Sequence, residues 1–413
     1  MIRLNVWMRI PDGAARLAGE MAATDSTPNG QFESEFEYSS EWLGFAHGFD
    51  LDPASLSRAR SRRFQATSFL PPLSVFDDVL PDSWGRRLMA IAIKADGRKP
   101  TSPELLRRIG ANGLGALSFS ESPDPPVPTV TGDKGELDEL LDSAEAFEAG
   151  RLPPDNRFRR LVEAGGTAGG ARPKALLHDK GIEWIAKFPS IARDEHHDVV
   201  GLEATCMELA RRAGLNVPDT RLQPIGRRRI LLVRRFDISE QGGRFHMLSF
   251  KSLCRERPGI FVTGYDDLAE ALRKYSTDPT ADVRALFRQA AFNAAIGNVD
   301  DHLKNFWILH GHEGWRLLPA FDLVPDTGAK HEHTLSFGLS LACPGLEVLV
   351  DMGKRWGVGE SAQIVAEVTE AVGGFSAVAK SLRVKGAPSV KQIRADIDRR
   401  LALLRRPAKS IGA

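Results

Sequence analysis

One segment, residues 294–322, restricts the local fold more strongly than any other part of the chain. It contains Asp300, an asparagine five residues later at Asn305, and a further carboxylate seventeen residues beyond that at Asp322. For side chains so spaced to act together, the chain has to leave one element, pass through a loop and return. The segment therefore predicts a specific succession of elements.

The residues around the three polar side chains indicate which elements these are. Gly297 is typical of the residue that ends a helix, so Asp300 is expected in the loop that follows. Residues 306–309 are apolar, residues 315–318 are apolar except for Arg316, and a turn that contains two glycines separates them. We expect a β-hairpin that brings Asp322 back towards Asn305.

This pattern is typical of phosphoryl transfer. In kinase-type sites an Asp accepts the hydroxyl proton, and an Asn and a second Asp hold the metal. Oxygen ligands of this kind suit Mg²⁺ bridging the phosphates of ATP. Asp300 is thus predicted as catalytic base, with Asn305 and Asp322 as metal ligands. The alternative is a polar turn whose carboxylates cap helices or face water.

A second candidate pair joins a strand to a helix. Lys187 lies within the apolar strand pattern of residues 184–188, and Glu203 lies within an apolar helical stripe in a helix expected over residues 196–213. A buried carboxylate needs a cation, and a Lys–Glu pair that touches ATP phosphates is part of kinase sites. The alternative is a Glu at the edge of the stripe, with a Lys whose amine reaches solvent.

Two further segments are weaker candidates for nucleotide binding. Residues 165–170 are rich in glycine, so the backbone around Gly169 and Gly170 could contact phosphates, and the hydroxyl of Thr167 could approach a γ-phosphate. The segment matches neither common phosphate-loop pattern, and taken alone it is better explained as a flexible hairpin loop. The strand that ends near Arg235 and Phe236 could be an interlobe hinge, or any strand that leads into a loop.

Length and composition set the class of protein. The chain has 413 residues, of which 42% are hydrophobic and 26% charged, and its net charge is +1. These values predict two or three globular domains without a general attraction to nucleic acid. Three dispersed cysteines, no visible signal peptide and no long apolar run predict a cytoplasmic protein with no membrane partner.

The order of patterns predicts the domain organisation. A proline-rich linker follows residue 121, strand patterns dominate residues 160–240, and helical patterns dominate from residue 265 onwards. We expect an α+β chain whose small β-rich lobe precedes a larger helical lobe. The predicted domains are 1–122, a linker and helix over 123–150, the small lobe over 151–240 and the large lobe over 241–413.

Taken together, these residues resemble the HipA family, the serine/threonine-kinase toxins of bacterial toxin–antitoxin modules. The segment Asn298-Val-Asp-Asp-His-Leu-Lys-Asn305 is the most specific part of the resemblance. The other matching stretches lie at residues 76–82, 115–117, 165–174, 186–189, 214–218, 235–237 and 321–322. The resemblance therefore extends nearly from end to end of the chain.

The resemblance implies a two-lobed protein-kinase-like core with an extra N-terminal α/β domain. It also implies that Lys187 binds the ATP phosphates, that Arg235 and Phe236 lie at the adenine, and that Asp300 rather than its neighbour Asp301 is the base. Autophosphorylation of a loop residue, here Thr167, is implied, although Thr replaces the Ser of the family. The implied partners are a small helix-turn-helix antitoxin, operator DNA through that antitoxin, and a protein substrate such as a translation component.

Two other functions share parts of this pattern. A small-molecule phosphotransferase of the aminoglycoside-kinase type uses the same Asp and Asn spacing, and would need an acidic pocket for a cationic substrate. A catalytically idle partner that strengthens the grip of an antitoxin on DNA would need none of Lys187, Asp300, Asn305 and Asp322. The presence of all four favours an enzyme.

Overall fold

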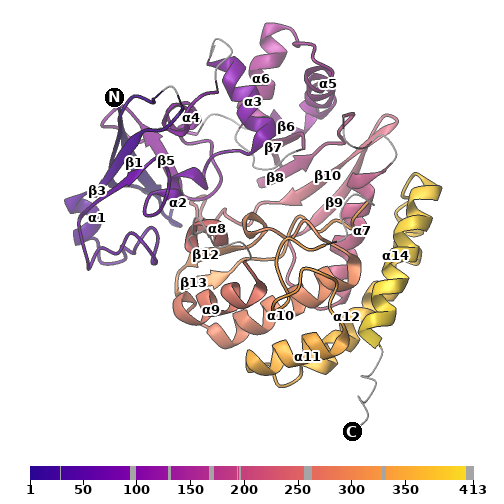
Figure 1. Ribbon diagram of the computed structural model, residues 1–413. Coiled ribbons are helices and arrows are strands. Elements are labelled where there is room, and N and C mark those ends of the chain that lie inside the picture. Colours follow the sequence, from indigo (N-terminus) through magenta and orange to yellow (C-terminus); the bar gives the residue numbers. More distant parts are fainter. Residues whose placement is uncertain are drawn as a thin grey trace. The chain divides into compact units, whose positions relative to one another are not determined.

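The computed structural model describes residues 1–27, 29–93, 99–128, 132–166, 172–192, 194, 197–254, 263–327 and 332–405 (Figure 1). The chain forms two compact units, each made of segments that are distant in the sequence. The first contains Met1–Ala192, Pro224–Arg255 and Leu309–His312, and the second contains Arg193–Gln223, Glu256–Ile308 and Glu313–Ala413. The predicted domain bounds stay a prediction.

The first unit begins with a five-stranded antiparallel sheet in the order β4-β3-β2-β1-β5. Its strands are β1 (Ile2–Arg9), β2 (Ala15–Ala23), β3 (Glu33–Tyr38), β4 (Arg63–Thr67) and β5 (Leu117–Ser120). In β3, Phe36 and Tyr38 are buried and alternate with more exposed glutamates, as is typical of a strand with one buried face. Four helices accompany this region: α1 (Ser40–Gly44), α2 (Ser74–Asp77), α3 (Ser83–Ala92) and α4 (Ser102–Ile109).

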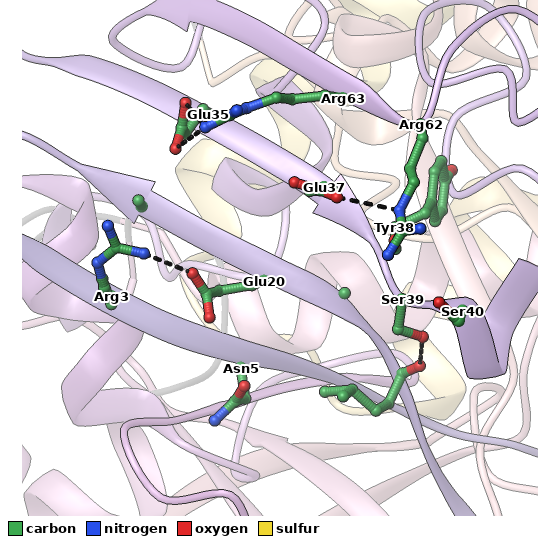
Figure 2. Close-up of a pocket in the computed structure, with 13 residues that line it drawn as sticks. Arg3, Asn5, Glu20, Glu35, Glu37, Tyr38, Ser39, Ser40, Arg62 and Arg63 are labelled. Carbon is green, nitrogen blue, oxygen red and sulfur yellow. Dashed lines mark hydrogen bonds and ion pairs between the residues drawn. The ribbon is translucent and has the colours of Figure 1, made fainter.

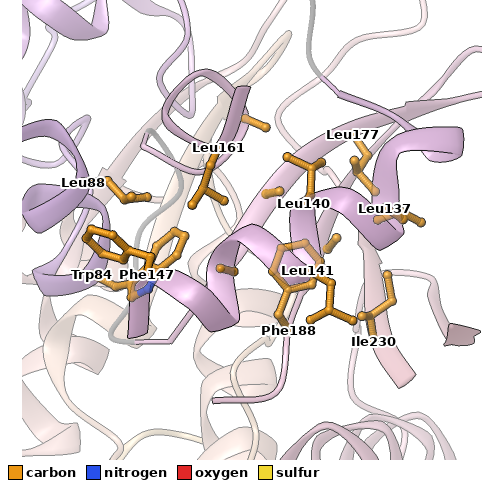
Figure 3. Close-up of a cluster of buried hydrophobic side chains, with 14 of the residues drawn as sticks. Trp84, Leu88, Leu137, Leu140, Leu141, Phe147, Leu161, Leu177, Phe188 and Ile230 are labelled. Atoms are coloured by element: carbon orange, nitrogen blue, oxygen red, sulfur yellow. The ribbon is translucent and has the colours of Figure 1, made fainter. Parts of the chain in front are cut away.

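A second sheet in the first unit has the neighbouring strands β6, β7, β8 and β10. These strands are β6 (Gly132–Asp133), β7 (Lys174–Asp179), β8 (Ile182–Lys187) and β10 (Arg228–Arg234). The helices α5 (Leu137–Glu148) and α6 (Asp155–Gly165) share a hydrophobic core with this sheet (Figure 3). Trp84 and Leu88 of α3 enter the same core, so a helix that precedes the proline-rich linker packs with elements that follow it. The first unit also contains β11 (His246–Ser249) and α8 (Phe250–Leu253).

The second unit is mainly helical. Its helices are α7 (Val199–Arg212), α9 (Tyr265–Tyr275), α10 (Pro279–Ile296), α11 (Leu346–Arg355), α12 (Ser361–Gly373), α13 (Phe375–Ser381) and α14 (Ala387–Arg405). Helix α10 contacts α9, α12 and α14 (Figure 1) and is buried on nearly all sides over its second half. Its second half therefore carries buried polar residues as well as buried apolar ones. Within the described ranges, no helix is long and apolar enough to cross a membrane.

The predicted helix–loop–hairpin is confirmed. Helix α10 ends at Gly297, whose φ of 75° is left-handed, and its N–H donates to the Asn293 carbonyl at 3.0 Å. After the short turn η2 (Leu303–Asn305), β12 (Trp307–Gly311) and β13 (Gly314–Leu317) form the hairpin. The remaining strand, β9 (Thr220–Ile225), follows α7.

Candidate functional site

The loop after α10 presents Asp300 and Asn305 in different environments. Asp300 is exposed, as a base that meets a substrate has to be. Asn305 is buried in η2, and its Nδ2 donates to the backbone carbonyl of Asp300 at 2.7 Å. This bond fixes the amide so that Oδ1 remains as an acceptor, which is the type of atom that Mg²⁺ takes from a protein.

The neighbouring Asp301 has a different role. Its side chain is 0% exposed, and it accepts hydrogen bonds from the Tyr265 hydroxyl at 2.7 Å and the Thr334 N–H at 2.8 Å. The Nδ1 of His333 lies 2.9 Å from the same carboxylate. A carboxylate enclosed by donors in this way holds the fold and cannot approach a substrate. Of the two adjacent aspartates, Asp300 therefore fits the role of base.

Asp322 lies on a segment that is tied at both ends beside this loop. The Leu318 N–H donates to the Trp307 carbonyl at 2.9 Å, and the Asp326 N–H donates to the Gly297 carbonyl at 2.7 Å. Asp322 stands between these two bonds with a φ of 57°, a conformation that is uncommon outside glycine. Unfavourable backbone angles of this kind cluster at functional sites, where the surrounding structure maintains them.

The hairpin that leads to Asp322 is held by Asp282, a residue that the sequence analysis missed. Its buried carboxylate accepts from the Arg316 guanidinium at 3.0–3.2 Å, from the Leu317 N–H at 2.8 Å and from the Ser276 hydroxyl at 2.6 Å. An acidic residue in the first turn of a helix ordinarily faces water and complements the helix dipole. Its type and position therefore gave no signal of this role.

Lys187 and Glu203 belong to different units, and their pairing stays a prediction. Lys187 is the last residue of β8 and is half-buried, in register with Leu231 of β10. Glu203 is 5% exposed, so the alternative in which its carboxylate reaches water does not hold. Burial, together with the charge of Glu203, raises the pKa of Cys206 well above its ordinary value, which places the carboxylate near that thiol.

The guanidinium of Arg235 forms a buried ion pair within the first unit. Its Nε and Nη2 donate to the Asp237 carboxylate at 3.0 and 2.6 Å, and the pair is buried. Burial opposes ionisation, but the Arg235 charge holds the pKa of Asp237 below its usual value. The Oδ2 of Asp237, which accepts from Nη2, also accepts from the Gly115 N–H at 2.8 Å. If Arg235 contacts the adenine, it therefore does so through its backbone. The next residue, Phe236, is half-buried.

Three of the predicted site residues are Thr167, Gly169 and Gly170. They lie outside the described residues. Among the residues that are described, no group of three or more His, Cys, Asp or Glu side chains could hold a metal ion. The predicted metal ligands are one Asn and one Asp, a set that leaves most coordination positions to phosphate oxygens and water, as Mg²⁺ sites commonly do.

A cavity of about 430 Å³ opens on the N-terminal sheet (Figure 2). Its charged side chains are paired with one another: Arg3 with Glu20 at 2.8 Å, Arg62 with Glu37 at 3.0 Å and Arg63 with Glu35 at 2.8 Å. None of the predicted site residues lines it. Because its charges already neutralise one another, it lacks the excess of acidic groups that a cationic substrate would need.

Comparisons with known proteins find similar sequences and a similar fold. The chain is 26% identical over 388 residues to the proposed kinase Y4mE of Sinorhizobium fredii, covering 86% of each chain. It is 28% identical over 314 residues to the serine/threonine-protein kinase toxin HipA of Shewanella oneidensis, covering 70% of this chain and 69% of that protein. It also shares the fold of Shewanella oneidensis HipA solved with HipB and operator DNA, with a TM-score of 0.69, 17% identity and coverage of 96% and 97%.

Family models decide the assignment. A model of the HipA N-terminal domain matches residues 14–120, and a model of the HipA-like C-terminal domain matches residues 166–374. The second alone spans half of the chain and includes Lys187, Asp300, Asn305 and Asp322. The two follow each other in the order that the sequence analysis anticipated, on a chain with the mixed helix and strand content of that prediction. The chain belongs to the HipA family.

Proposed function

We propose that this protein is an ATP-dependent serine/threonine protein kinase, the toxin component of a toxin–antitoxin module. It transfers the γ-phosphoryl group of ATP to a protein hydroxyl. The observation that carries the proposal is the contrast between Asp300 and Asp301: the first is exposed and hydrogen-bonded through its backbone to Asn305, and the second is buried among donors. The HipA relative of Shewanella oneidensis is named as such a kinase.

In this proposal Asp300 accepts the proton of the attacking hydroxyl. Asn305 and Asp322 would hold Mg²⁺, which would neutralise negative charge on the phosphates. Lys187, oriented by Glu203, contacts the phosphates of ATP. The protein thus acts mainly by positioning and by electrostatics, because phosphoryl transfer requires little covalent chemistry from side chains.

The adenine and the glycine-rich segment complete the scheme. Arg235 and Phe236 border the adenine, with Arg235 acting through its main chain because its guanidinium is paired with Asp237. Gly169 and Gly170 offer backbone N–H groups to the phosphates, and Thr167 is the candidate for autophosphorylation.

A solved relative supports one of the proposed partners. The Shewanella oneidensis HipA structure contains HipB and operator DNA. We propose a corresponding helix-turn-helix antitoxin for this chain, with operator DNA bound through it, and a translation component as the protein substrate.

Labelled ATP tests the proposal. Purified protein is incubated with [γ-³²P]ATP and a bacterial lysate, or with an aminoglycoside, and phosphorylated residues are mapped by mass spectrometry. We expect label in protein and none in the aminoglycoside. Asp300→Asn should abolish transfer with an unchanged melting temperature, whereas Asp301→Asn should lower the melting temperature. Wild-type transfer by Asp300→Asn would contradict the proposal.

A further inference from the structure

A series of buried polar side chains runs from the candidate catalytic loop to the C-terminal helix α14. We call Tyr265, Asp301, His333 and Arg400 the loop anchor. All four are at most 6% exposed. Asp301 contacts Tyr265 and His333 through Oδ2, and the Nη1 of Arg400 lies 3.4 Å from the Nε2 of His333. A loop residue is thereby connected to a helix that begins at residue 387.

The donors and acceptors of the loop anchor are matched at each contact. The Asp301 carboxylate can only accept, so His333 donates from Nδ1. A neutral imidazole with its proton on Nδ1 has an acceptor at Nε2, which is the atom that faces the Arg400 guanidinium. The hydrogen-bond partners therefore assign a single tautomer to His333. Because the His333 imidazole contacts both Arg400 and Asp301, a displacement of Arg400 displaces Asp301 as well.

Arg400 is itself held in place at the end of α10. Its Nε donates to the Asp396 carboxylate one turn earlier at 2.8 Å. Partial burial opposes ionisation of Asp396, but the hydrogen bonds from Arg400 and Arg399 keep its pKa below the usual value. A Cβ added to Gly297 would lie 2.9 Å from the Arg400 Nε, so the guanidinium packs against the residue that ends α10. A cation is favourable at a helix C-terminus.

Tyr265 connects the same carboxylate to the start of the loop. Its hydroxyl donates to Asp301 and accepts from the Asn293 Nδ2 at 2.9 Å. The Oδ1 of Asn293 in turn accepts from the Asn298 Nδ2 at 3.1 Å, and both asparagines are buried. The loop is thus fixed at Asn298, at Asp301 and at Gly297, on both sides of Asp300.

We propose that Arg400 is a positioning residue for phosphoryl transfer, and that it sets the catalytic loop through His333 and Asp301. Helix α14 is then part of the apparatus that places Asp300 and Asn305. The kinetic part of this inference rests on the proposed kinase activity. The structural part, that Arg400 orders residues 298–305, does not.

The test compares two arginines that are adjacent on α14. Arg400→Met removes the buried guanidinium, and Arg399→Met makes the same change at an exposed arginine that also pairs with Asp396. Amide hydrogen exchange of residues 298–305 and the kinetics of labelled-ATP transfer are measured for both. For Arg400→Met we expect faster exchange in the loop and a kcat about 10- to 100-fold lower, with KM for ATP within about twofold, since small displacements of reacting groups have effects of this size. Arg399→Met should match the wild type.

Tyr265→Phe provides a second, smaller change, because it removes only the hydroxyl that joins Asp301 to Asn293. It should raise exchange in the same residues, and Arg400→Lys should recover part of the kcat lost in Arg400→Met. Wild-type exchange and kcat in Arg400→Met would overturn the inference, as would a kcat that falls only in proportion to the unfolded fraction. If Arg400→Met does not fold, Arg400→Lys takes its place in both measurements, and wild-type values there would overturn the inference. If the wild type transfers no phosphate, the proposed function fails while hydrogen exchange still decides the inference.

Discussion

The side-chain amide of Asn305 and the backbone carbonyl of Asp300 are joined by a hydrogen bond of 2.7 Å. The bond couples the candidate metal ligand to the candidate base, so that a displacement of one moves the other. The bond also holds the two residues at a fixed separation. The η2 turn, which ends at Asn305, closes the loop that begins at Asp300.

The first prediction separates the two roles of Asn305. Asn305→Ala removes both the metal ligand and the hydrogen bond, and should lower kcat by about 100-fold or more, as loss of one electrostatic contact to the reacting phosphate does. Asn305→Asp keeps an oxygen ligand and loses the donor, and should lower kcat by about 10-fold through misplacement alone. Steady-state phosphorylation kinetics over a Mg²⁺ titration measure both effects.

Asn5→Ala is the matched control, because the Asn5 Nδ2 donates to the Ser122 carbonyl at 2.8 Å on the N-terminal sheet. It should leave kcat unchanged. Wild-type kinetics in Asn305→Asp would show that the bond to Asp300 does not contribute. Equal losses in Asn305→Ala and Asn305→Asp would show that the metal contact adds nothing, and normal kinetics in Asn305→Ala would remove Asn305 from the metal site.

The second prediction concerns the support of Asp322. Arg316→Met leaves the buried Asp282 carboxylate without its bidentate partner, and should lower the free energy of unfolding by about 2–3 kcal/mol, because the Leu317 N–H and the Ser276 hydroxyl still donate to it. The apparent Mg²⁺ affinity should fall as well, since the hairpin leads to Asp322. Denaturant unfolding and Mg²⁺-dependent kinetics provide the measurements.

Arg284→Met is the control for this pair, because the Arg284–Glu360 ion pair also involves α10 but lies at the surface. Exposed pairs contribute little, so neither stability nor Mg²⁺ affinity should change. A loss of stability in Arg316→Met without any change in Mg²⁺ affinity would mean that Asp322 is positioned independently of the hairpin.

How far the sequence predicts this molecule depends on the range of the interaction. The end of α10 and the hairpin follow from local patterns of glycine and apolar residues, and both predictions are confirmed. The contacts of Asp301 with His333 and of Asp282 with Arg316 join residues 32 and 34 apart through single hydrogen-bonded groups. Such contacts have no periodicity, so the sequence gives no sign of them.

The sequence does contain a local signal for the ion pair between Arg235 and Asp237. Arg235 and Asp237 stand two residues apart directly after a buried strand, and residues at this spacing in extended backbone point to the same side. Opposite charges there favour an internal pair. The interpretation of this segment as a hinge rests on the position of Arg235 at the end of a strand and does not consider Asp237.

The third prediction is a loss of stability in acid. Burial lowers the pKa of His246 to about 4, and burial with the charge of His246 lowers that of His310 to about 3. The unfolded chain binds these protons from about pH 6.5 downwards and the folded chain only near pH 4 or below, so acidification favours unfolding. Over this window His246 alone should account for about 3 kcal/mol.

Guanidinium unfolding between pH 8 and pH 4 measures this slope. His246→Gln removes the titrating ring and can still donate to the Leu51 carbonyl that now lies 2.8 Å from Nε2, so its slope should be shallower. His178→Gln changes an exposed histidine of the same unit and should keep the wild-type slope. Parallel slopes for all three proteins would rule out His246 as a source of acid sensitivity.

The fourth prediction decides whether the Arg235 guanidinium serves the fold or the nucleotide. Asp237→Asn leaves the buried Arg235 guanidinium without its carboxylate, and should cost about 3–5 kcal/mol of unfolding free energy. The double variant Arg235→Met/Asp237→Asn removes the unpaired charge and keeps an oxygen for the Gly115 N–H, so it should recover much of that loss. Because the guanidinium is committed to Asp237, calorimetry should give the double variant an ATP affinity within about threefold of the wild type. A folded double variant that binds ATP more than about tenfold more weakly would assign the guanidinium to the nucleotide and make the ion pair with Asp237 a feature of the ATP-free state.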